Sequence, residues 1–332
     1  MNRNYPQAHP IHKELKVSRN LTLAVAQVGG INTDDSKADV VARLIKLLEE
    51  AAGRGADLVV FPELTLTTFF PRTWFDDEDA VDRYFEKSMP NSDVQPLFNR
   101  AQQLGVGFYL GYAELTSDGK RYNTAILVDR QGSVVGKYRK MHLPGHADNR
   151  QGLPNQHLEK KYFLEGDLGF GVFDFHGTKI GMCLCNDRRW PEVYRALALQ
   201  GAEVVLLGYN TPDFVPGWQE EPHAKMFAHL LSIQAGAYQN SVFVAAAGKS
   251  GFEDGNHMIG GSAVVAPSGE ILTKAAGEDD EVLIVKTDLD MSKPYRESVF
   301  DFAAHRRPDA YGIIAERKGR GEPLPVDFSV NA

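Results

Sequence analysis

The stretch Gly181-Met-Cys-Leu-Cys-Asn-Asp-Arg-Arg-Trp-Pro-Glu192 joins an apolar strand to the start of a helix. The strand is expected to end near Cys185, and Pro191 suits the first turn of a helix because its fixed φ angle matches helical geometry. A strand followed by a helix is the repeating unit of α/β folds. We expect the turn to expose the Cys185 thiol beside Arg188 and Arg189, and nearby cations lower a thiol pKa. The stretch therefore indicates an α/β fold and a candidate nucleophile, although a cysteine at a strand end can also be a small buried apolar residue.

Further apolar runs predict an α/β chain with a mixed sheet. Alternation of strand and helix around 21–61 and around 179–207 favours parallel pairing, whereas 107–138 is typical of successive antiparallel strands. Strands are predicted at 21–28, 58–61, 107–113, 124–128, 179–185, 204–207, 242–246, 263–266 and 282–287. Helices with one apolar face are predicted at 36–53, 192–200 and 223–238.

The chain is expected to form one domain. Its 332 residues, 43% hydrophobic and 24% charged, can bury a large core. No internal repeat and no linker rich in proline, serine and glycine divides the middle of the sequence. We predict a domain over 20–315, an N-terminal extension over 1–19 and a C-terminal tail over 316–332, because both ends lie outside the strand and helix pattern.

Charge and cysteine content narrow the classes of function. The net charge of −8 argues against nucleic-acid binding, which needs a basic surface. No apolar run has the length of a membrane span and residues 1–20 lack the apolar centre of a signal peptide, so we expect a cytoplasmic protein that does not bind membranes. Cys183 and Cys185 lie two residues apart on one predicted strand, at the edge of disulfide reach, so free thiols are expected. No histidine pair has a convincing metal spacing, and we expect neither a metal nor a cofactor.

Two distant segments could supply the groups that a nucleophilic thiol needs. Glu63 ends the apolar run Leu58-Val-Val-Phe-Pro-Glu63, where α/β sheets place functional groups, although such a glutamate can also be a solvated cap. Lys140 lies in a cationic strand that runs into a turn. Strand alternation puts Lys140 and Tyr138 on one face and Arg139 on the other, so Lys140 can point inward.

These segments resemble the signature segments of a known family. Phe61-Pro-Glu63, Lys137-Tyr-Arg-Lys-Met-His-Leu-Pro144 and Cys185-Asn-Asp-Arg-Arg-Trp-Pro-Glu192 are similar, in the same order, to the Glu, Lys and Cys segments of the nitrilase (carbon-nitrogen hydrolase) superfamily. The resemblance is strongest to its N-carbamoyl-D-amino-acid amidohydrolases. The further segments that carry it are Leu66-Thr-Thr-Phe-Phe-Pro-Arg72, His157-Leu-Glu-Lys160, Gly208-Tyr-Asn-Thr-Pro212 and Gln234-Ala-Gly-Ala-Tyr-Gln-Asn240.

The resemblance implies a catalytic set and an architecture. It makes Cys185 the nucleophile, Glu63 the general base and Lys140 the stabiliser of the tetrahedral oxyanion. Glu159 would assist the lysine or orient the substrate. The implied fold is an α-β-β-α sandwich that pairs with a second copy into an α-β-β-α-α-β-β-α dimer, so a homodimer or homotetramer is expected.

The resemblance also implies residues that bind substrate. Arg188 and Arg189 would hold a substrate carboxylate, since a guanidinium can donate two parallel hydrogen bonds to it. The alternative is that they form surface ion pairs with Asp187 or Glu192. Further pocket residues implied are Asn186, His157, Asn210, Thr211, His142 and His223. Three aromatic residues could line the pocket or pack in the core, namely Phe69, Phe70 and Trp74.

The expected reaction is hydrolysis of the carbamoyl C–N bond of an N-carbamoyl-D-amino acid to the D-amino acid, CO2 and NH3 through a cysteine-bound intermediate. Alternatives within the family are a β-ureidopropionase-like enzyme or a general aliphatic amidase or nitrilase. A non-catalytic scaffold is disfavoured because Glu63, Lys140 and Cys185 are all present. Thiol redox chemistry is disfavoured because the two cysteines form Cys-x-Cys on a strand.

Overall fold

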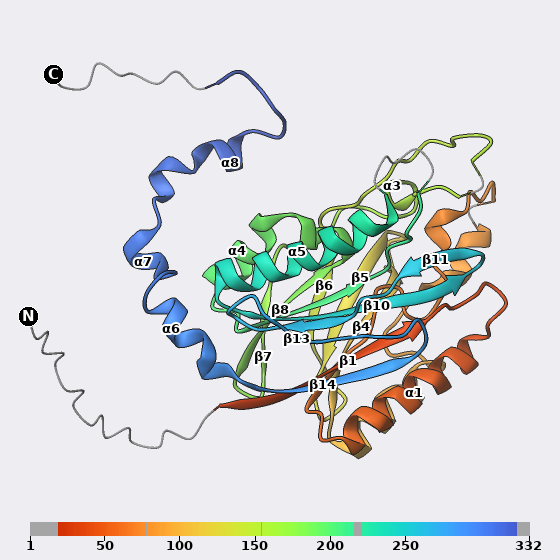
Figure 1. Ribbon diagram of the computed structural model, residues 1–332. Coiled ribbons are helices and arrows are strands. Elements are labelled where there is room, and N and C mark those ends of the chain that lie inside the picture. Colours follow the sequence, from red (N-terminus) through yellow and green to blue (C-terminus); the bar gives the residue numbers. More distant parts are fainter. Residues whose placement is uncertain (1–18, 78, 154, 216–220, 324–332) are drawn as a thin grey trace, which may run out of the picture.

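The computed structural model describes residues 19–77, 79–153, 155–215 and 221–323. Within these ranges fourteen strands form one hydrogen-bonded network whose main path runs β6-β5-β4-β2-β1-β10-β9-β8-β7 (Figure 1). The strands are β1 Asn20–Gly29, β2 Leu58–Val60, β3 Phe85–Glu86, β4 Gly107–Leu115, β5 Arg121–Val128, β6 Val134–Arg139, β7 Val172–Phe175, β8 Thr178–Leu184, β9 Val204–Tyr209, β10 Phe243–Glu253, β11 Asn256–Ile259, β12 Ala263–Val265, β13 Ile271–Lys274 and β14 Glu281–Asp288.

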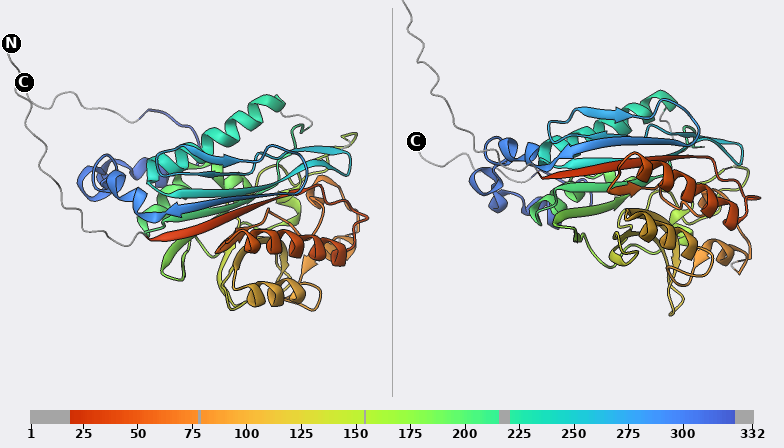
Figure 2. Two further views of the ribbon diagram at one scale, coloured as in Figure 1. Left: turned by 60° about the horizontal axis from the view of Figure 1, so that its bottom comes forward. Right: turned by 90° about the horizontal axis from the view of Figure 1, so that it is seen from below.

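The helices lie outside the strands. They are α1 Lys37–Gly53, α2 Gln95–Leu104, α3 Glu159–Tyr162, α4 Pro191–Leu199, α5 Pro222–Asn240, α6 Lys293–Arg296, α7 Phe302–His305 and α8 Gly312–Glu316. The sheet folds over at the β1–β10 pair into two layers, with α1 and α2 on one outer face and α4 and α5 on the other (Figure 2). This is the expected α-β-β-α sandwich with a mixed sheet. Its pairing with a second copy stays a prediction.

The predicted strand directions are confirmed. β1 pairs parallel with β2, β8 pairs parallel with β9, and β4, β5 and β6 follow one another antiparallel. Parallel neighbours place their carboxyl ends at one edge of the sheet. The loops after β8 and β9 therefore start side by side, and the folding of the sheet into two layers brings the loop after β2 against β9.

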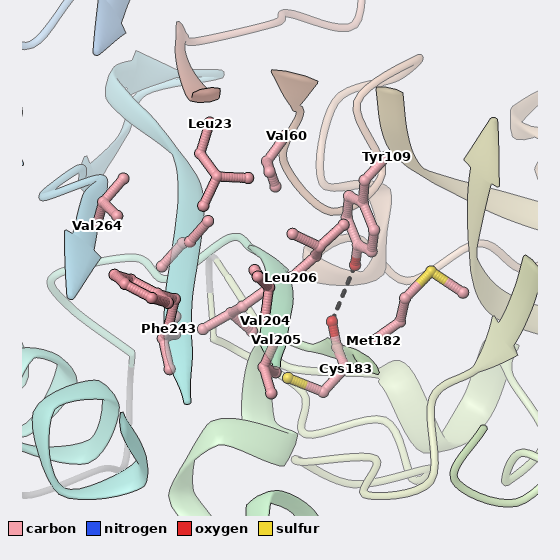
Figure 3. Packing of buried hydrophobic residues seen from close by; sticks show 14 of the residues in the cluster. Leu23, Val60, Tyr109, Met182, Cys183, Val204, Val205, Leu206, Phe243 and Val264 are labelled. Atoms are coloured by element: carbon pink, nitrogen blue, oxygen red, sulfur yellow. Dashed lines mark hydrogen bonds between the residues drawn. The ribbon is translucent and has the colours of Figure 1, made fainter. Parts of the chain in front are cut away.

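Two apolar cores hold the layers. One lies between the two sheet layers and under α4 and α5, and contains Leu23, Val60 and Leu206 (Figure 3). The other lies between the outer face of the first layer and the helices α1 and α2, and contains Leu44 and Phe98. Burying each such side chain contributes roughly 1.5–3 kcal/mol.

Tyr109 of β4 joins the two layers directly beneath the nucleophile strand. Its buried hydroxyl donates a hydrogen bond to the carbonyl of Cys183 at 2.9 Å (Figure 3). It also accepts one from the amide of Gly208 at 3.2 Å. A buried phenol needs such partners because an unpaired polar group inside a core is costly. The contact fixes β8 and β9 against β4.

The sequence predictions missed several short elements. Helix α2 and strands β7, β11 and β13 were not predicted; each of the three strands has only four residues, too few to show a period. The proposed boundaries at 20 and 315 stay predictions, and residues 1–18 and 324–332 of the two extensions lie outside the described ranges. No helix of the described chain combines the length and apolar character that crossing a bilayer requires.

Candidate active site

The candidate nucleophile sits on a sharp turn. β8 ends at Leu184. Cys185, the first residue of the 3-10 helix Cys185–Arg189, has a left-handed φ of 44°. For a residue other than glycine, this conformation costs roughly 1–2 kcal/mol and needs support from its surroundings. Asp187 provides support, since its carboxylate accepts hydrogen bonds from the Leu184 amide at 2.9 Å and the Tyr138 hydroxyl at 2.8 Å.

The thiol is buried, which corrects the expectation that the turn exposes it. Cys185 is 3% exposed because the turn folds back under the segments after β6 and β9. Burial raises the pKa of the Cys185 thiol, and the carboxylate of Glu63 adds to this, whereas Lys140 and Arg188 act in the opposite direction. The expected lowering of the thiol pKa is therefore wrong for the resting site. The thiol needs a base to lose its proton.

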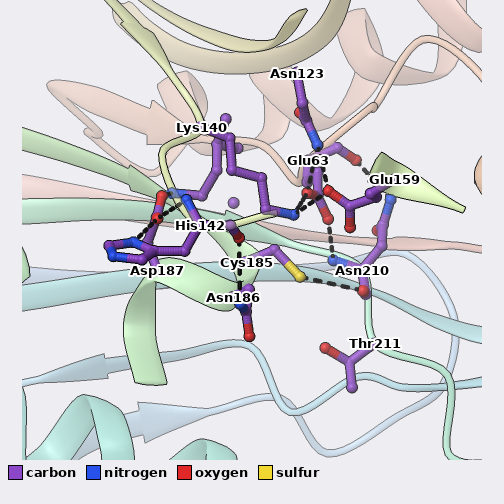
Figure 4. Close-up of polar contacts among 12 residues, drawn as sticks. Glu63, Asn123, Lys140, His142, Glu159, Cys185, Asn186, Asp187, Asn210 and Thr211 are labelled. Carbon is purple, nitrogen blue, oxygen red and sulfur yellow. Dashed lines mark hydrogen bonds and ion pairs between the residues drawn. The ribbon is translucent and has the colours of Figure 1, made fainter. Parts of the chain in front are cut away.

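The structure brings the predicted base and the predicted lysine together near this thiol. The Nζ of Lys140 lies 2.7 Å from Glu63 Oε1 and 2.6 Å from Glu159 Oε2 (Figure 4). All three side chains are buried. Asn123 of β5, which sequence reasoning missed, donates to Glu63 Oε1 at 2.8 Å. Buried ions require such partners, so this arrangement is held in one geometry.

Glycines let the Glu63 backbone pass between neighbouring strands. A Cβ on Gly111 of β4 would lie 2.7 Å from the Cα of Glu63, and a Cβ on Gly208 of β9 would lie 2.7 Å from its amide nitrogen. Any side chain at either position would push Glu63 away. The backbone amide of Lys140 donates to the Asn123 carbonyl at 2.8 Å, which extends the β5–β6 pairing to the lysine.

The environment separates the two glutamates chemically. Burial raises the pKa of Glu63, and the neighbouring charge of Glu159 raises it further against the opposing effect of Lys140. Burial would also raise the pKa of Glu159, but Lys140 and His157 together hold it below the usual value. Glu63 can thus exchange a proton, while Glu159 stays ionised and balances the lysine. Two carboxylates whose pKa values are pushed apart are typical of an acid–base site.

Asn210, which follows β9, links the base to the nucleophile. Its backbone amide donates to Glu63 Oε2 at 3.0 Å, and its side-chain amide donates to the Glu63 carbonyl at 2.8 Å. The thiol of Cys185 donates to the Asn210 carbonyl at 3.4 Å (Figure 4). The loop after β9 therefore sets the relative position of the thiol and its base.

The two neighbouring arginines differ in their surroundings. Arg188 is buried and donates to the Cys185 carbonyl at 2.7 Å and to the Thr211 hydroxyl at 2.9 Å. Arg189 is half-buried and donates to the Asn186 side-chain oxygen at 3.3 Å. Neither of the alternative ion pairs, with Asp187 or Glu192, is formed by Arg188 within the described chain.

A narrow pocket opens above the thiol. Of the predicted substrate-binding residues, its described lining includes His157, Arg189, Asn210 and Thr211. Lys225 of α5 is buried, donates to the Pro212 carbonyl at 3.1 Å, and was missed because it lies far along the chain on a helix. The described residues that line the pocket are Pro144, His157, Cys185, Arg189, Asn210, Thr211, Pro212, Val215 and Lys225.

Two of the predicted pocket histidines, His142 and His223, are not among the described lining residues. His142 stacks on Trp190 with ring centroids 5.1 Å apart and pairs with Asp187 at 2.7 Å. His223 is exposed in the first turn of α5. Asn186 donates to the His142 carbonyl at 3.2 Å.

The three aromatic residues also divide. The Phe69 ring lies 5.5 Å from the ring of pocket residue His157. Phe70 stacks on Tyr84 in a separate core cluster. Trp74 lies under the ammonium of Lys161 at 4.0 Å. Across the described ranges, no group of three or more His, Cys, Asp or Glu side chains is arranged to hold a metal ion.

An α-β-β-α sandwich with a cysteine, a lysine and two glutamates gathered after its strands defines a hydrolase of the nitrilase class. Residues 22–297 match the family described as Carbon-nitrogen hydrolase. The chain belongs to the carbon-nitrogen hydrolase family, and it is a hydrolase of non-peptide C–N bonds.

Individual relatives agree with this family. The chain is 29% identical over 316 residues to an N-carbamoylputrescine amidase of Solanum lycopersicum, covering 91% of this chain and 97% of the relative. It is 32% identical over 267 residues to a nitrilase of Pyrococcus abyssi, covering 80% and 90%. A solved carbon-nitrogen hydrolase from Helicobacter pylori superposes with a TM-score of 0.78 at 26% identity, covering 90% of this chain and 99% of that one.

Proposed function

We propose that this chain hydrolyses the carbamoyl or primary amide group of a small substrate through a covalent intermediate on Cys185. This is the general amidase alternative of the sequence analysis, and relatives named as N-carbamoylputrescine amidase and nitrilase support it. The observation that carries the proposal is the buried Lys140, ion-paired to Glu63 at 2.7 Å and Glu159 at 2.6 Å beside the thiol.

The proposed chemistry gives each buried group a defined role, with Glu63 carrying the protons in both half-reactions. Glu63 takes the thiol proton, and the sulfur of Cys185 attacks the carbonyl carbon. Lys140 stabilises the oxyanion, an interaction worth roughly 3–4 kcal/mol in comparable sites. Collapse breaks the C–N bond, and the proton on Glu63 leaves with the nitrogen. Glu63 then deprotonates water, which attacks the acyl carbon; the C–S bond breaks, and Glu63 returns the proton to the departing thiolate.

A narrower candidate within this class is an N-carbamoyl-D-amino acid. Arg189 and Lys225 line the described pocket beside the thiol, and both cations suit a substrate carboxylate. N-carbamoylputrescine carries a cationic amine instead, which these two residues would repel. The pocket composition therefore favours an anionic substrate, whereas the relatives favour the broader amidase class.

A kinetic comparison tests both levels of the proposal. The ratio kcat/KM would be measured for N-carbamoyl-D- and L-amino acids, N-carbamoyl-β-alanine, N-carbamoylputrescine and simple aliphatic amides. The general proposal is supported if the native protein turns over any amide or carbamoyl substrate faster than the Cys185→Ala variant does. Preference for the cationic or neutral substrates would remove the narrower candidate and leave the general one standing.

A further inference from the structure

We propose that Arg188 is a further catalytic residue that stabilises the thiolate of Cys185, and that it does not bind the substrate carboxylate. The inference rests on the proposed function only in taking Cys185 as the nucleophile. It reverses the role that the family resemblance implies for Arg188, and it leaves recognition of an anionic substrate to Arg189 and Lys225.

The position of the guanidinium is the first argument. Arg188 Nη1 lies 3.7 Å from the sulfur of Cys185 and 2.7 Å from its carbonyl oxygen. Nη2 is anchored on Thr211 at 2.9 Å, and the guanidinium carbon lies 4.9 Å from the ring centroid of Tyr209. The residue is 1% exposed and is not among the described residues that line the pocket. It therefore lies beneath the thiol rather than facing a bound substrate.

The balance of buried charge is the second argument. Within the described chain, Arg188 has no carboxylate in an ion pair, and its Nε has no hydrogen-bond partner. A buried cation without an anion is costly. Lys140 faces two buried carboxylates, Glu63 and Glu159, so these three side chains carry one net negative charge when both glutamates are ionised. Arg188 is a buried cation beside the thiol that can offset this charge.

Proton transfer keeps this balance and moves the negative charge toward Arg188. The S–H bond of Cys185 breaks, an O–H bond forms on Glu63, and the electron pair remains on sulfur. After the transfer the two buried anions near the cations are the thiolate and Glu159. The nearby carboxylate of Asp187 is already satisfied by its own donors, including the Leu184 amide.

A purely structural role for Arg188 is the competing explanation, because the contact with the Cys185 carbonyl also supports the turn. The two roles differ in what they do to thiol ionisation. The other charged groups around the thiol, Glu63, Lys140 and Glu159, are unchanged in an Arg188 variant. Arg189 is a matched control, since it is the next residue, carries the same charge and lines the pocket.

The test is the pH dependence of Cys185 alkylation by iodoacetamide in the full chain, which needs no knowledge of the substrate. An opposite charge this close shifts a pKa by about 1–3 units, so Arg188→Met should move the alkylation midpoint up by that amount. Alkylation below the midpoint should slow by roughly 10-fold or more. Arg188→Lys should restore much of the shift, and Arg189→Met should move the midpoint far less.

An unchanged midpoint in folded Arg188→Met, or an equal shift in Arg189→Met, would overturn the proposal. If Arg188→Met does not fold, Arg188→Gln makes the same test, because its amide can still donate to the Cys185 carbonyl without carrying charge. Failure of every substrate in the kinetic comparison, with the midpoint shift still present, would instead count against the proposed function alone.

Discussion

The bottom of the pocket, called its base below, and the mouth of the pocket are built in different ways. The base consists of Glu63, Lys140, Glu159 and Cys185, which are 0–3% exposed, and its charged groups contact one another directly. The mouth is formed by loop residues such as Pro212 and Val215 and by the cations of Arg189, which is half-buried, and Lys225, which is buried. Segments after strands carry Glu63, Lys140 and Cys185 of the base and α3 carries Glu159, whereas loops, the turn after β8 and α5 supply the mouth. The difference indicates that the base determines the reaction and the mouth determines which molecule reacts.

Removing the nucleophile should have the largest effect. Cys185→Ala should lower kcat by about 10⁶-fold, as expected for loss of a covalent nucleophile, while the Tm changes little because one small side chain replaces another. Steady-state kinetics and thermal unfolding measure the two quantities.

Cys183→Ala is the matched control for this change. Cys183 lies two residues earlier on β8, is fully buried in the core and is not among the described residues that line the pocket. The variant should keep kcat and lose stability by about 1 kcal/mol. A comparable loss of activity in both variants would show that disturbance of β8, and not removal of the Cys185 thiol, lowers the activity.

Replacing the buried lysine of the base should have the next largest effect. Lys140→Met should lower kcat by roughly 10²–10³-fold, because the oxyanion loses its charged donor. Lys249 is a second buried lysine, paired to Glu253 at 2.7 Å outside the pocket. Lys249→Met should destabilise the fold by about 3–5 kcal/mol but leave kcat of the folded fraction nearly unchanged. Equal kcat losses would contradict the special role of the base.

Changes at the mouth should be smaller and should depend on the substrate. Arg189→Met and Lys225→Met should each raise KM for a carboxylate-bearing substrate by roughly 10- to 100-fold, the range expected for one charge-assisted contact, with little change in kcat. A neutral amide should be affected far less. Equal losses on both substrates would mean that these cations support the base rather than select the substrate.

The smallest expected effect is a shift in pH dependence. The charge of Glu159 adds to burial in raising the pKa of Glu63, so kcat/KM should fall as pH decreases through that raised value. Glu159→Gln removes the like charge, lowers the pKa of Glu63 and should move this acidic limb to lower pH by about one unit. A limb that stays in place or moves upward would assign it to another group.

The sequence predicted the base better than the mouth for a physical reason. Cys185 directly follows β8 and Glu63 comes three residues after the end of β2, and α/β sheets place functional groups at such carboxyl ends, so both could be chosen as candidates from the sequence. Lys225 could not be linked to them, because a helix distant in sequence gives no sign of which strand end it covers. Arg188 and Arg189 were indistinguishable, since the orientation of a single 3-10 turn depends on contacts such as those of Asp187.

Burial of the thiol was missed for a related reason. The segments that cover Cys185, after β6 and after β9, carry no strand or helix pattern of their own. The local sequence therefore showed the positive charges next to the thiol, but it did not show how deeply the thiol is buried. The pKa direction depends on that depth more than on the charge.

The most direct test of the division between base and mouth is a crystal structure of Cys185→Ala with its best anionic substrate bound. The account predicts that the scissile carbonyl lies at the base, with its oxygen toward Lys140, and that the carboxylate contacts Arg189 or Lys225. A carboxylate bound to Arg188, or a carbonyl placed away from Lys140, would contradict it.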